Sequence, residues 1–348
     1  MSRHTGTTRA SQLWFTSPYR VEVREVALPP PDPEQVLVRV SFSAPSPGTE
    51  LLVYRGQLPA SMALDSSLEA LQQAADYPLQ YGYSCVGEVQ QVGSAVDPAW
   101  LGRQVFSFQP HCSHFLATTD ALQPVPDDVT AEQAVFLPNM ETAINLVQDG
   151  QPLIGERVLV LGQGIVGLLL SALLVRHPLQ SLVAIEGRPC RQDLSRQLGV
   201  PRVLAPEQAR DSITVFGDGQ AATSGADLIY EVSGHPEALN LAVHLSGFAS
   251  RIVIGSWYGS KPVAVELGGA AHRNRLQLIT SQVSTLAPAL SGRWDKQRRF
   301  ELAWEMLRQV DPRQLVTQVL PLQEADSLYR QLHEEQPGIL QPLFHYPE

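Results

Sequence analysis

The chain has 348 residues, of which 44% are hydrophobic and 17% charged, a composition typical of a folded globular protein with room for two domains. Its 25 Lys and Arg against 35 Asp and Glu leave a net charge of −10, and no basic stripe interleaved with aromatics occurs, which argues against nucleic acid and membrane partners. The N-terminus, MSRHTGTTRASQLW, lacks the apolar core of a signal peptide, and the three cysteines are unclustered, so we expect a cytoplasmic protein with reduced thiols.

The first part of the chain is β-rich. Residues 13–26 and 35–44 run apolar or alternate around a proline-rich segment, which is typical of strands. A polar stretch at 65–75 favours a helix, and strand character returns from residue 77 onward. Residues 129–147 have helical spacing, so we expect the boundary to a second domain near residues 138–150.

A glycine motif organises the second part of the chain. The sequence RVLVLGQGIVGLLLSALLV at 157–175 places G-x-G-x-x-G between an apolar strand and a helix, the context that a dinucleotide site needs. The first glycine permits the tight turn, the second lets the backbone approach a pyrophosphate, and the third lets the helix pack on the strand. The phosphates would lie at the helix N-terminus. The predicted cofactor residues of this motif are Gly162, Gly164, Ile165, Val166 and Gly167.

An acidic residue, Glu186, ends the next apolar run. A carboxylate there accepts the adenosine ribose hydroxyls and repels a 2′-phosphate, which favours NAD. Arg188 and Arg191 follow it, and either guanidinium can pair with a phosphate, so NADP is left open. Both arginines are equally well explained as the solvated start of the next helix.

The strand and helix pattern continues to the end of the chain. Apolar runs at 226–232 and 251–254 flank a helical segment, and 275–280 is a plausible last strand. This alternation predicts a doubly wound parallel sheet. Two of these runs end in pairs of small residues at the edge where such sheets bind ligands. These further predicted cofactor residues are Ser233, Gly234, Gly255 and Ser256.

Five segments together carry a resemblance that covers essentially the whole chain. They are PGTELLVYRG at 47–56, YGYSCVGEVQQVG at 81–93, FLPNMETAINLV at 136–147, the glycine motif, and VLPLQEADSLY at 319–329. In this order they resemble the medium-chain dehydrogenase/reductase superfamily, the zinc-type alcohol dehydrogenases. The SPGTE and GY segments look most like the branch that contains bacteriochlorophyllide (hydroxyethyl) dehydrogenase.

The resemblance implies an α/β fold, in which a doubly wound parallel Rossmann sheet accompanies a β-rich GroES-like catalytic domain. It implies the GroES-like part at 1–145, the Rossmann domain at 146–285, and a C-terminal segment, 286–348, that returns to the catalytic domain. Thr142 matches a position that contacts the cofactor in this superfamily.

The residues that hold zinc in this superfamily are replaced here. The first ligand, a Cys, corresponds to Pro47; the second, a His, to Tyr83; and the third, a Cys or Glu, to Pro138. The lobe with four cysteines is also missing, since only Cys112 lies in that region. We therefore predict no metal site and no catalytic or structural zinc.

One other cluster has metal-capable side chains. The segment QPHCSHF contains His111, Cys112 and His114, but alternation on a strand would separate neighbouring side chains. No second cluster completes four ligands, so a loop with a hydrogen-bonded His is the favoured interpretation.

Without zinc, a hydroxyl, phenol or imidazole must polarise the substrate oxygen. Thr49 matches the Ser or Thr that relays the alcohol proton in the superfamily. Tyr83 would point a phenol into the former metal position, as hydrogen-bond donor or base, or it merely fills the volume that zinc leaves. Glu50 matches an acid behind the metal ligands, and His111 is a further acid or base candidate.

These observations favour a zinc-independent NAD(P)-dependent oxidoreductase that acts on a secondary alcohol or ketone. One alternative is a quinone-reductase-like enzyme that reduces C=C bonds of enones, and another is a non-catalytic dinucleotide-binding sensor or scaffold. The partner would be a small molecule, and Trp257, Tyr258 and Trp294 allow it to be large or aromatic. Relatives pair the edge strands of their nucleotide domains, so 275–280 predicts a homodimer.

Overall fold

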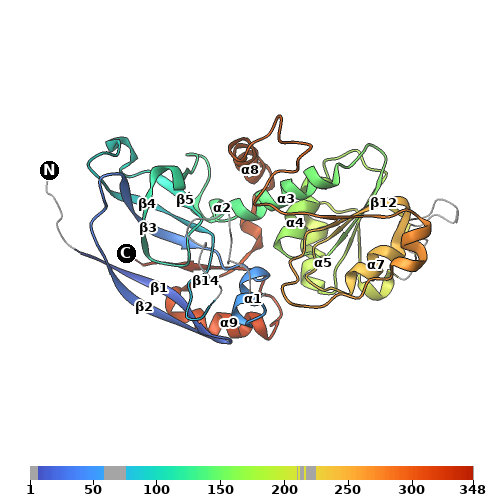
Figure 1. Ribbon diagram of the computed structural model, residues 1–348, viewed down its shortest axis with the longest axis horizontal. Coiled ribbons are helices and arrows are strands. Elements are labelled where there is room, and N and C mark those ends of the chain that lie inside the picture. The colour runs from blue at the N-terminus through green and yellow to red at the C-terminus, as the bar shows by residue number, and fades with distance from the viewer. Residues whose placement is uncertain (1–6, 59–75, 210, 212–214, 217–224, 348) are drawn as a thin grey trace. The chain divides into compact units, whose positions relative to one another are not determined.

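The structure is a computed structural model that describes residues 7–58, 76–209, 211, 215–216 and 225–347 (Figure 1). The predicted helical stretch at 65–75 lies outside the described residues. The chain divides into two compact units, one formed by Met1–Pro138 with Asp311–Glu348 and the other by Asn139–Val310. The second unit is thus continuous in sequence, whereas the first is built from both ends of the chain.

The second unit contains a six-stranded parallel sheet in the order β10-β9-β8-β11-β12-β13. This order starts in the middle, runs to one edge, returns and runs to the other, which is the doubly wound arrangement. The predicted parallel sheet is therefore confirmed. Its strands are β8 (Arg157–Leu161), β9 (Ser181–Ile185), β10 (Arg202–Leu204), β11 (Ala226–Glu231), β12 (Ser246–Ile254) and β13 (Gln277–Thr280).

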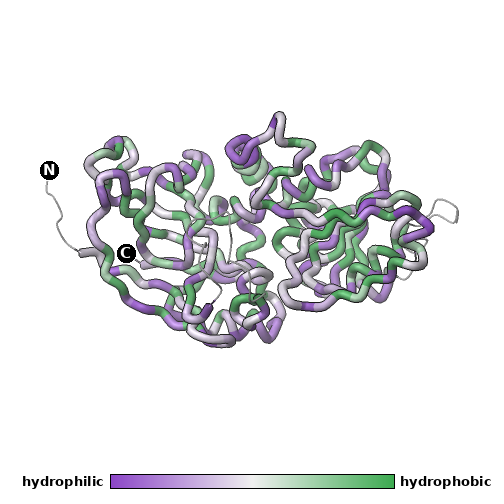
Figure 2. The backbone as a smooth tube through the Cα atoms, viewed as in Figure 1, coloured by the Kyte–Doolittle hydropathy of each residue, from purple (hydrophilic) through white to green (hydrophobic). Residues whose placement is uncertain are grey.

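Helices connect these strands. Apolar residues run through the central strands, as Figure 2 shows, and Val158 to Leu161 of β8 are all buried, as expected for strands covered on both faces. β12 begins at Ser246, before the predicted apolar run at 251–254. The sequence did not predict this earlier start, because the first residues of the strand include Gly247 and the exposed Phe248 and show no apolar pattern. The helices are α3 (Leu137–Gly150), α4 (Ile165–Leu174), α5 (Pro189–Gln197), α7 (Ala238–Leu245) and α8 (Lys296–Val310).

The first unit is β-rich. Its seven-stranded sheet has the order β14-β15-β3-β4-β5-β7, with β6 also paired to β3, and β1 pairs with β2 in a separate hairpin. All pairs are antiparallel except β14 with β15. The strands are β1 (Thr8–Ser17), β2 (Arg20–Leu28), β3 (Gln35–Ser43), β4 (Cys85–Val92), β5 (Gln104–Ser107), β6 (His114–Thr118), β7 (Gln123–Pro124), β14 (Val316–Pro321) and β15 (Gln341–His345).

The first unit also contains α2 (Ala131–Ala134), and two of its helices bear on the site described below: α1 (Thr49–Tyr54) and α9 (Ala325–His333). The aromatic ring of Tyr329 in α9 stacks on Tyr54 of α1 at 5.5 Å and meets Phe15 of β1 edge to face at 5.2 Å. The C-terminal segment therefore shares one apolar core with the N-terminal strands. None of the helices formed by the described residues has both the length and the apolar character of a membrane span.

Candidate active site

The glycine motif forms a tight turn between β8 and α4. Gly162 has φ of +95°, which favours glycine, and a Cβ built on it would lie 2.5 Å from the Cα of Ser233. A Cβ on Gly167 would lie 2.1 Å from the carbonyl oxygen of Gly162, so the helix packs directly on the turn. Around Gly164 the space is open, with only the Arg191 guanidinium at 3.9 Å. The turn therefore fits a pyrophosphate at the N-terminus of α4.

Glu186 follows β9 and is held against the glycine turn. Its carboxylate accepts hydrogen bonds from the backbone N–H groups of Gln163, at 2.7 Å, and Arg188, at 2.9 Å. Arg188 is the residue before α5, and Arg191 lies in its first turn. The structure thus brings Glu186 and both arginines to the same loop region as the glycines, where the adenosine half of a dinucleotide would bind.

The ends of β11 and β12 lie beside this turn. The backbone N–H of Gly234 donates to the hydroxyl of Ser256 at 2.9 Å, and the N–H groups of Gly255 and Ser256 both donate to the carbonyl oxygen of Glu231. The four predicted strand-end residues are therefore held together. Glu231, which the sequence analysis did not select, is the buried group that links them.

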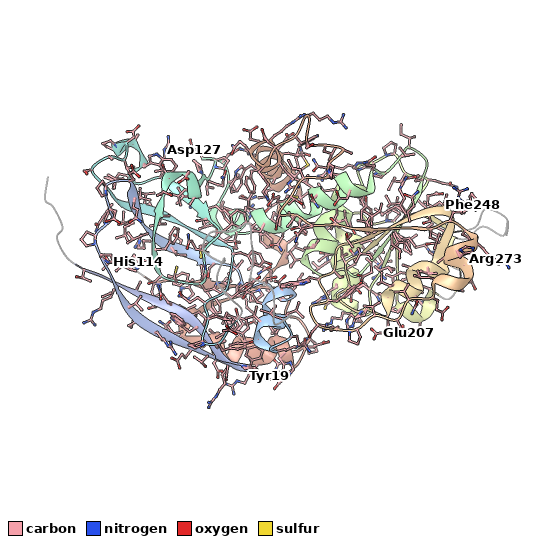
Figure 3. The ribbon with its side chains drawn as sticks, viewed as in Figure 1. Tyr19, His114, Asp127, Glu207, Phe248 and Arg273 are labelled. Atoms are coloured by element: carbon pink, nitrogen blue, oxygen red, sulfur yellow. The ribbon has the colours of Figure 1, made fainter. Side chains whose placement is uncertain are left out.

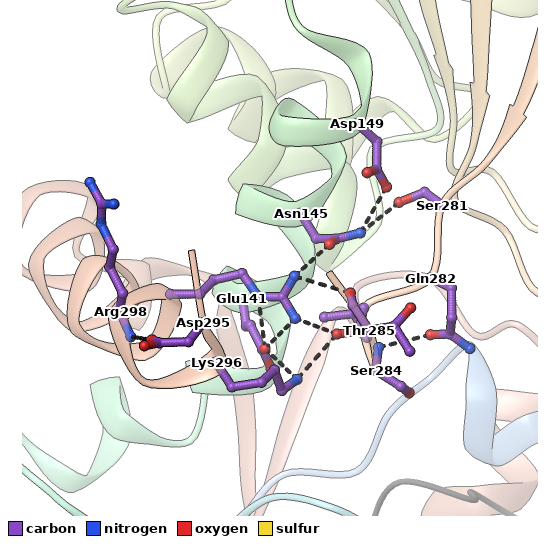
Figure 4. A network of polar contacts seen from close by, with 12 residues as sticks. Glu141, Asn145, Asp149, Ser281, Gln282, Ser284, Thr285, Asp295, Lys296 and Arg298 are labelled. Atoms are coloured by element: carbon purple, nitrogen blue, oxygen red, sulfur yellow. Dashed lines mark hydrogen bonds and ion pairs between the residues drawn. The ribbon is translucent and has the colours of Figure 1, made fainter. Parts of the chain in front are cut away.

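A charged network surrounds Glu141, the residue before Thr142 in α3 (Figure 4). Arg299 of α8 is fully buried and donates to the Glu141 carboxylate through Nε, at 3.0 Å, and Nη2, at 2.8 Å. Lys296 donates to the same oxygen at 2.6 Å, and Arg299 also bonds Asn145. Arg299 and Lys296 further bond the Val283 carbonyl oxygen, so the network fixes the segment after β13. Thr142 is half-buried next to it.

The first unit contains a chain of buried polar groups around Glu50 and His111. The Nε2 atom of His111 lies 3.1 Å from Glu50, and its Nδ1 atom lies 2.7 Å from the Ser43 hydroxyl, which in turn bonds the Tyr346 hydroxyl at 2.7 Å. Tyr329 donates to the same Glu50 oxygen, and the backbone N–H of Ser46 donates to the other oxygen at 2.8 Å. Glu50 and His111 are both fully buried.

The donors and acceptors among these hydrogen-bonded groups can be assigned by elimination. An ionised carboxylate only accepts, so Nε2 of His111 carries the proton in its bond to Glu50. In a neutral imidazole Nδ1 then accepts from Ser43, whose oxygen accepts from Tyr346. Burial and the neighbouring Glu50 charge raise the pKa of Tyr329 well above its usual range, so this phenol keeps its proton and donates. Both carboxylate oxygens of Glu50 and both ring nitrogens of His111 are therefore engaged in hydrogen bonds.

Thr49 and Tyr83 border this buried chain and are half-buried themselves. Thr49 begins α1 directly before Glu50. Tyr83 packs edge to face on Tyr81 with ring centroids 6.2 Å apart and belongs to the same apolar cluster as Tyr329. A Cβ on the preceding Gly82 would lie 3.0 Å from the His111 ring. The four predicted catalytic residues thus gather in one region, with Thr49 and Tyr83 the more exposed pair.

The residues present do not fit a zinc ion. Of the three positions that the resemblance assigns to zinc ligands, two carry prolines and the third carries the phenol of Tyr83. The zinc-capable side chains nearby, Glu50 and His111, are bonded to each other and have their remaining polar atoms engaged by Ser43, Ser46 and Tyr329. Within the described residues no group of three His, Cys, Asp or Glu side chains is arranged to hold a metal.

The segment QPHCSHF is a loop leading into β6 rather than a strand. His114, labelled in Figure 3, contacts the Ser113 hydroxyl at 3.1 Å, whereas His111 faces Glu50. Cys112 lies beside Cys85 in the core, and burial raises the pKa of the Cys85 thiol well above its usual range. A hydrogen-bonded His in a loop, the favoured interpretation, describes His111.

Besides Glu231, further groups that no sequence pattern singled out complete these clusters: Ser43, Tyr329 and Tyr346 in the first unit and Arg299 in the second. Ser43 and Tyr346 are 303 positions apart, so no local pattern links them. A fully buried arginine requires a buried acid as its partner, but the burial of Arg299 is visible only in the structure.

Comparisons with known proteins place this geometry among dehydrogenases. No protein-family model matches the chain. D-guloside 3-dehydrogenase of Escherichia coli (strain K12) is 26% identical over 325 residues, covering 87% of this chain and 90% of that protein. The crystal structure of 2R,3R-butanediol dehydrogenase from Bacillus subtilis has a TM-score of 0.78 at 17% identity and covers 97% of this chain and 100% of its own.

A structure of a short chain alcohol dehydrogenase from Escherichia coli CFT073, in complex with NADH, has a TM-score of 0.77 at 18% identity and covers 98% of this chain and 100% of its own. These relatives and structural neighbours are named as dehydrogenases of alcohols or polyols, in line with the resemblance. The fold, the glycine turn and these relatives together make the chain an NAD(P)-dependent dehydrogenase of the alcohol dehydrogenase type.

Proposed function

We propose that the chain is a zinc-independent oxidoreductase that transfers hydride between a nicotinamide and a secondary alcohol or ketone. The proposal rests on the side chains at the three positions that the resemblance assigns to zinc ligands. Pro47 and Pro138 offer no donor atom, and the acid and imidazole beside Tyr83 are already bonded to each other. Polarisation of the substrate oxygen then falls to hydroxyl groups.

We assign the proposed roles from how far each side chain is exposed to solvent. Bound NAD(P) supplies or accepts the hydride. Thr49 and Tyr83 are the half-buried members of the cluster, so they are the groups that would touch substrate. Thr49 relays the alcohol proton, and Tyr83 donates a hydrogen bond to the developing oxyanion. Glu50 and His111 are fully buried, so they act as positioning residues that fix the start of α1 and the loop at Gly82.

Two lines support a secondary alcohol as substrate. The relatives are named for guloside oxidation at carbon 3 and for butanediol oxidation, and these are internal hydroxyl positions. The resemblance to bacteriochlorophyllide (hydroxyethyl) dehydrogenases also implies a secondary alcohol, on a large aromatic substrate. Trp257 is 38% exposed and offers an aromatic surface beside the end of β12. A substrate panel therefore needs both polyols and aryl ketones.

We also propose that NAD is preferred over NADP. Glu186 is held by two backbone N–H groups at the position where a carboxylate disfavours a 2′-phosphate. Binding of the two cofactors, measured by calorimetry, tests this. Binding of NADP that is about tenfold tighter, or about 1.4 kcal/mol, would show that Arg188 and Arg191 dominate.

The deciding experiment measures NADH oxidation with ketones and enones and determines metal content in the same sample. Turnover of ketones without stoichiometric zinc supports the proposal. About one zinc per chain, with activity lost to a chelator, contradicts zinc independence. Turnover of enones alone indicates a C=C reductase, and tight cofactor binding without turnover indicates a sensor or scaffold.

We further propose a homodimer that forms through the edge of β13. Among the strands of the described residues this strand pairs with β12 alone, and Leu278 on it is 42% exposed. An uncovered strand edge invites pairing with a second copy. A monomer by light scattering at micromolar concentration would contradict this assembly.

A further inference from the structure

Glu231 is a fully buried acid at the carboxyl edge of the parallel sheet. It ends β11 and lies opposite Leu161 of β8 on one side and Ile254 of β12 on the other. The chain leaves β8 toward β9 and later returns to β11, so the strand order reverses between β8 and β11. Doubly wound sheets bind dinucleotides at this switch point.

Among the described residues, every group that donates a hydrogen bond to the Glu231 carboxylate is neutral. One oxygen accepts from the backbone N–H of Ser233, at 2.8 Å, and from its hydroxyl, at 2.5 Å. The other accepts from the Tyr258 hydroxyl. Burial, followed by the charge of Glu231, raises the pKa of Tyr258, so the phenol remains a donor. Three donors and no acceptor match an ionised carboxylate.

No cation neutralises this charge directly. Within the part of the chain that the structure describes, Glu231 forms no ion pair. The nearby Lys261 directs its ammonium to the carbonyl oxygen of Gly234 at 3.3 Å. In Glu141 the same unit has a buried acid that is neutralised by Arg299 and Lys296. Glu231 therefore contributes net negative potential to its surroundings.

The cofactor's reacting half belongs next to this charge. The pyrophosphate fits at Gly164, and Glu186 marks the adenosine half over β9. The nicotinamide half then lies over β11 and β12, on the other side of the glycine turn. Ser233, which bonds Glu231, is in van der Waals contact with Gly162 of that turn, because no Cβ fits between them.

We propose that the Glu231 carboxylate selects the oxidised cofactor. The oxidised nicotinamide ring carries a positive charge and the reduced ring none, so a fixed negative charge beside it stabilises the oxidised form alone. The site is thereby biased toward binding NAD⁺ over NADH. This inference rests on the cofactor site of the proposed function but not on the substrate or on the absence of zinc.

Binding of NAD⁺ and NADH to the full chain tests the inference, and neither measurement requires turnover. In Glu231→Gln the Kd for NAD⁺ should rise by about tenfold, equivalent to about 1.4 kcal/mol, while the Kd for NADH changes much less. Tyr258→Phe is the matched control, because it removes one hydrogen bond of the same acid and keeps the charge. It should retain the preference of the wild type for NAD⁺.

A purely structural role of Glu231 gives a different result, since loosened turns at Ser233 and Gly255 weaken both cofactor forms equally. Equal losses in Glu231→Gln, or an equal change of the NAD⁺ to NADH ratio in both variants, would overturn the inference. If Glu231→Gln does not fold, Glu231→Asp keeps the charge, and a loss of the NAD⁺ preference there would also overturn it. A protein that shows the predicted ratio but reduces no ketone would contradict only the proposed function.

Discussion

Glu141 in the second unit and Glu50 in the first are both buried carboxylates, and their hydrogen-bond partners differ in charge. Glu141 of the second unit is bonded by the guanidinium of Arg299 and the ammonium of Lys296, so its charge is neutralised by full cations. Glu50 of the first unit is bonded by an imidazole, a phenol and a backbone N–H. The first arrangement fixes three segments of chain in place. The second holds a negative charge with neutral donors, which keep Glu50 and His111 in place beside Thr49 and Tyr83.

The largest expected effect comes from removing the cation at Glu141. Arg299→Met has a similar length but leaves a buried acid with only the partly exposed Lys296. We expect the free energy of unfolding of the second unit to fall by about 3–5 kcal/mol, as for other broken buried ion pairs. Chemical denaturation of the purified variant measures this loss.

Lys296→Met is the matched control, because its side chain is 41% exposed and contacts the same oxygen of Glu141. Its loss should be below about 1 kcal/mol. Equal losses in the two variants would mean that Glu141 is neutralised by both cations alike and that burial of Arg299 adds nothing.

The next effect concerns turnover. Tyr83→Phe removes the phenol hydroxyl with little change of volume, so kcat and kcat/KM should fall together by roughly 10² if the hydroxyl acts in the transition state. Cofactor affinity should not change. Steady-state kinetics with the best ketone of the panel measures this. Near-normal turnover in Tyr83→Phe together with a loss in Tyr83→Ala would assign the ring to packing.

Glu50→Gln tests whether the stability of the hydrogen-bonded groups around Glu50 and His111 depends on the charge of Glu50. The amide cannot accept from Tyr329, Ser46 and His111 at once, and it presents donors where only donors surround it. We expect a loss of stability of about 2 kcal/mol, the range for a buried polar group left without a partner. Glu22→Gln, at an acid whose side chain is 51% exposed, is the control and should stay near wild type in the same denaturation experiment.

The smallest effect lies at the edge of the Glu141 network. Burial raises the pKa of Asp149, and its bonds to Ser281 and Asn145 and the Arg299 charge only partly oppose this. A raised folded-state pKa gives stability that is present at acidic pH and lost as pH rises through that pKa. Asp149→Asn should therefore be slightly more stable than wild type near neutral pH, by less than about 0.5 kcal/mol because solvent screens this half-exposed group.

The same comparison repeated at about pH 4 should show no difference between Asp149→Asn and wild type. Thermal melts at both pH values measure it. A gain that grows toward acidic pH would have the wrong sign and would show that Asp149 is stabilised by the Arg299 charge.

The parts that the sequence predicted well are those in which local spacing determines geometry. The glycines at 162, 164 and 167 predict a strand, turn and helix, and the structure leaves no room for a Cβ at 162 and 167. The sequence places Glu186 directly after the next strand, where the structure has it, and the resemblance points to Thr49, Glu50 and Tyr83, whose roles stay predictions. Each of these predictions uses neighbours in sequence or a known order of motifs.

The parts that the sequence could not predict depend on contacts between distant residues. Tyr329 reaches Glu50 across 279 positions, and Arg299 reaches Glu141 across 158. Glu231 follows an apolar run as many strand-end acids do, and only the structure shows that Tyr258 and Ser233 donate to it. Burial of an acid depends on its partners, which a pattern of single residues does not contain.

The order of the strands in the first unit also affects how the chain folds as it is made. β15 lies between β14 and β3 in the sheet, and Tyr346 just after it completes the bond to Ser43. Synthesis proceeds from the N-terminus, so β3 cannot pair with β15 until the whole second unit has left the ribosome. The continuous second unit can therefore fold first, while the early strands of the first unit remain incomplete and open to chaperones.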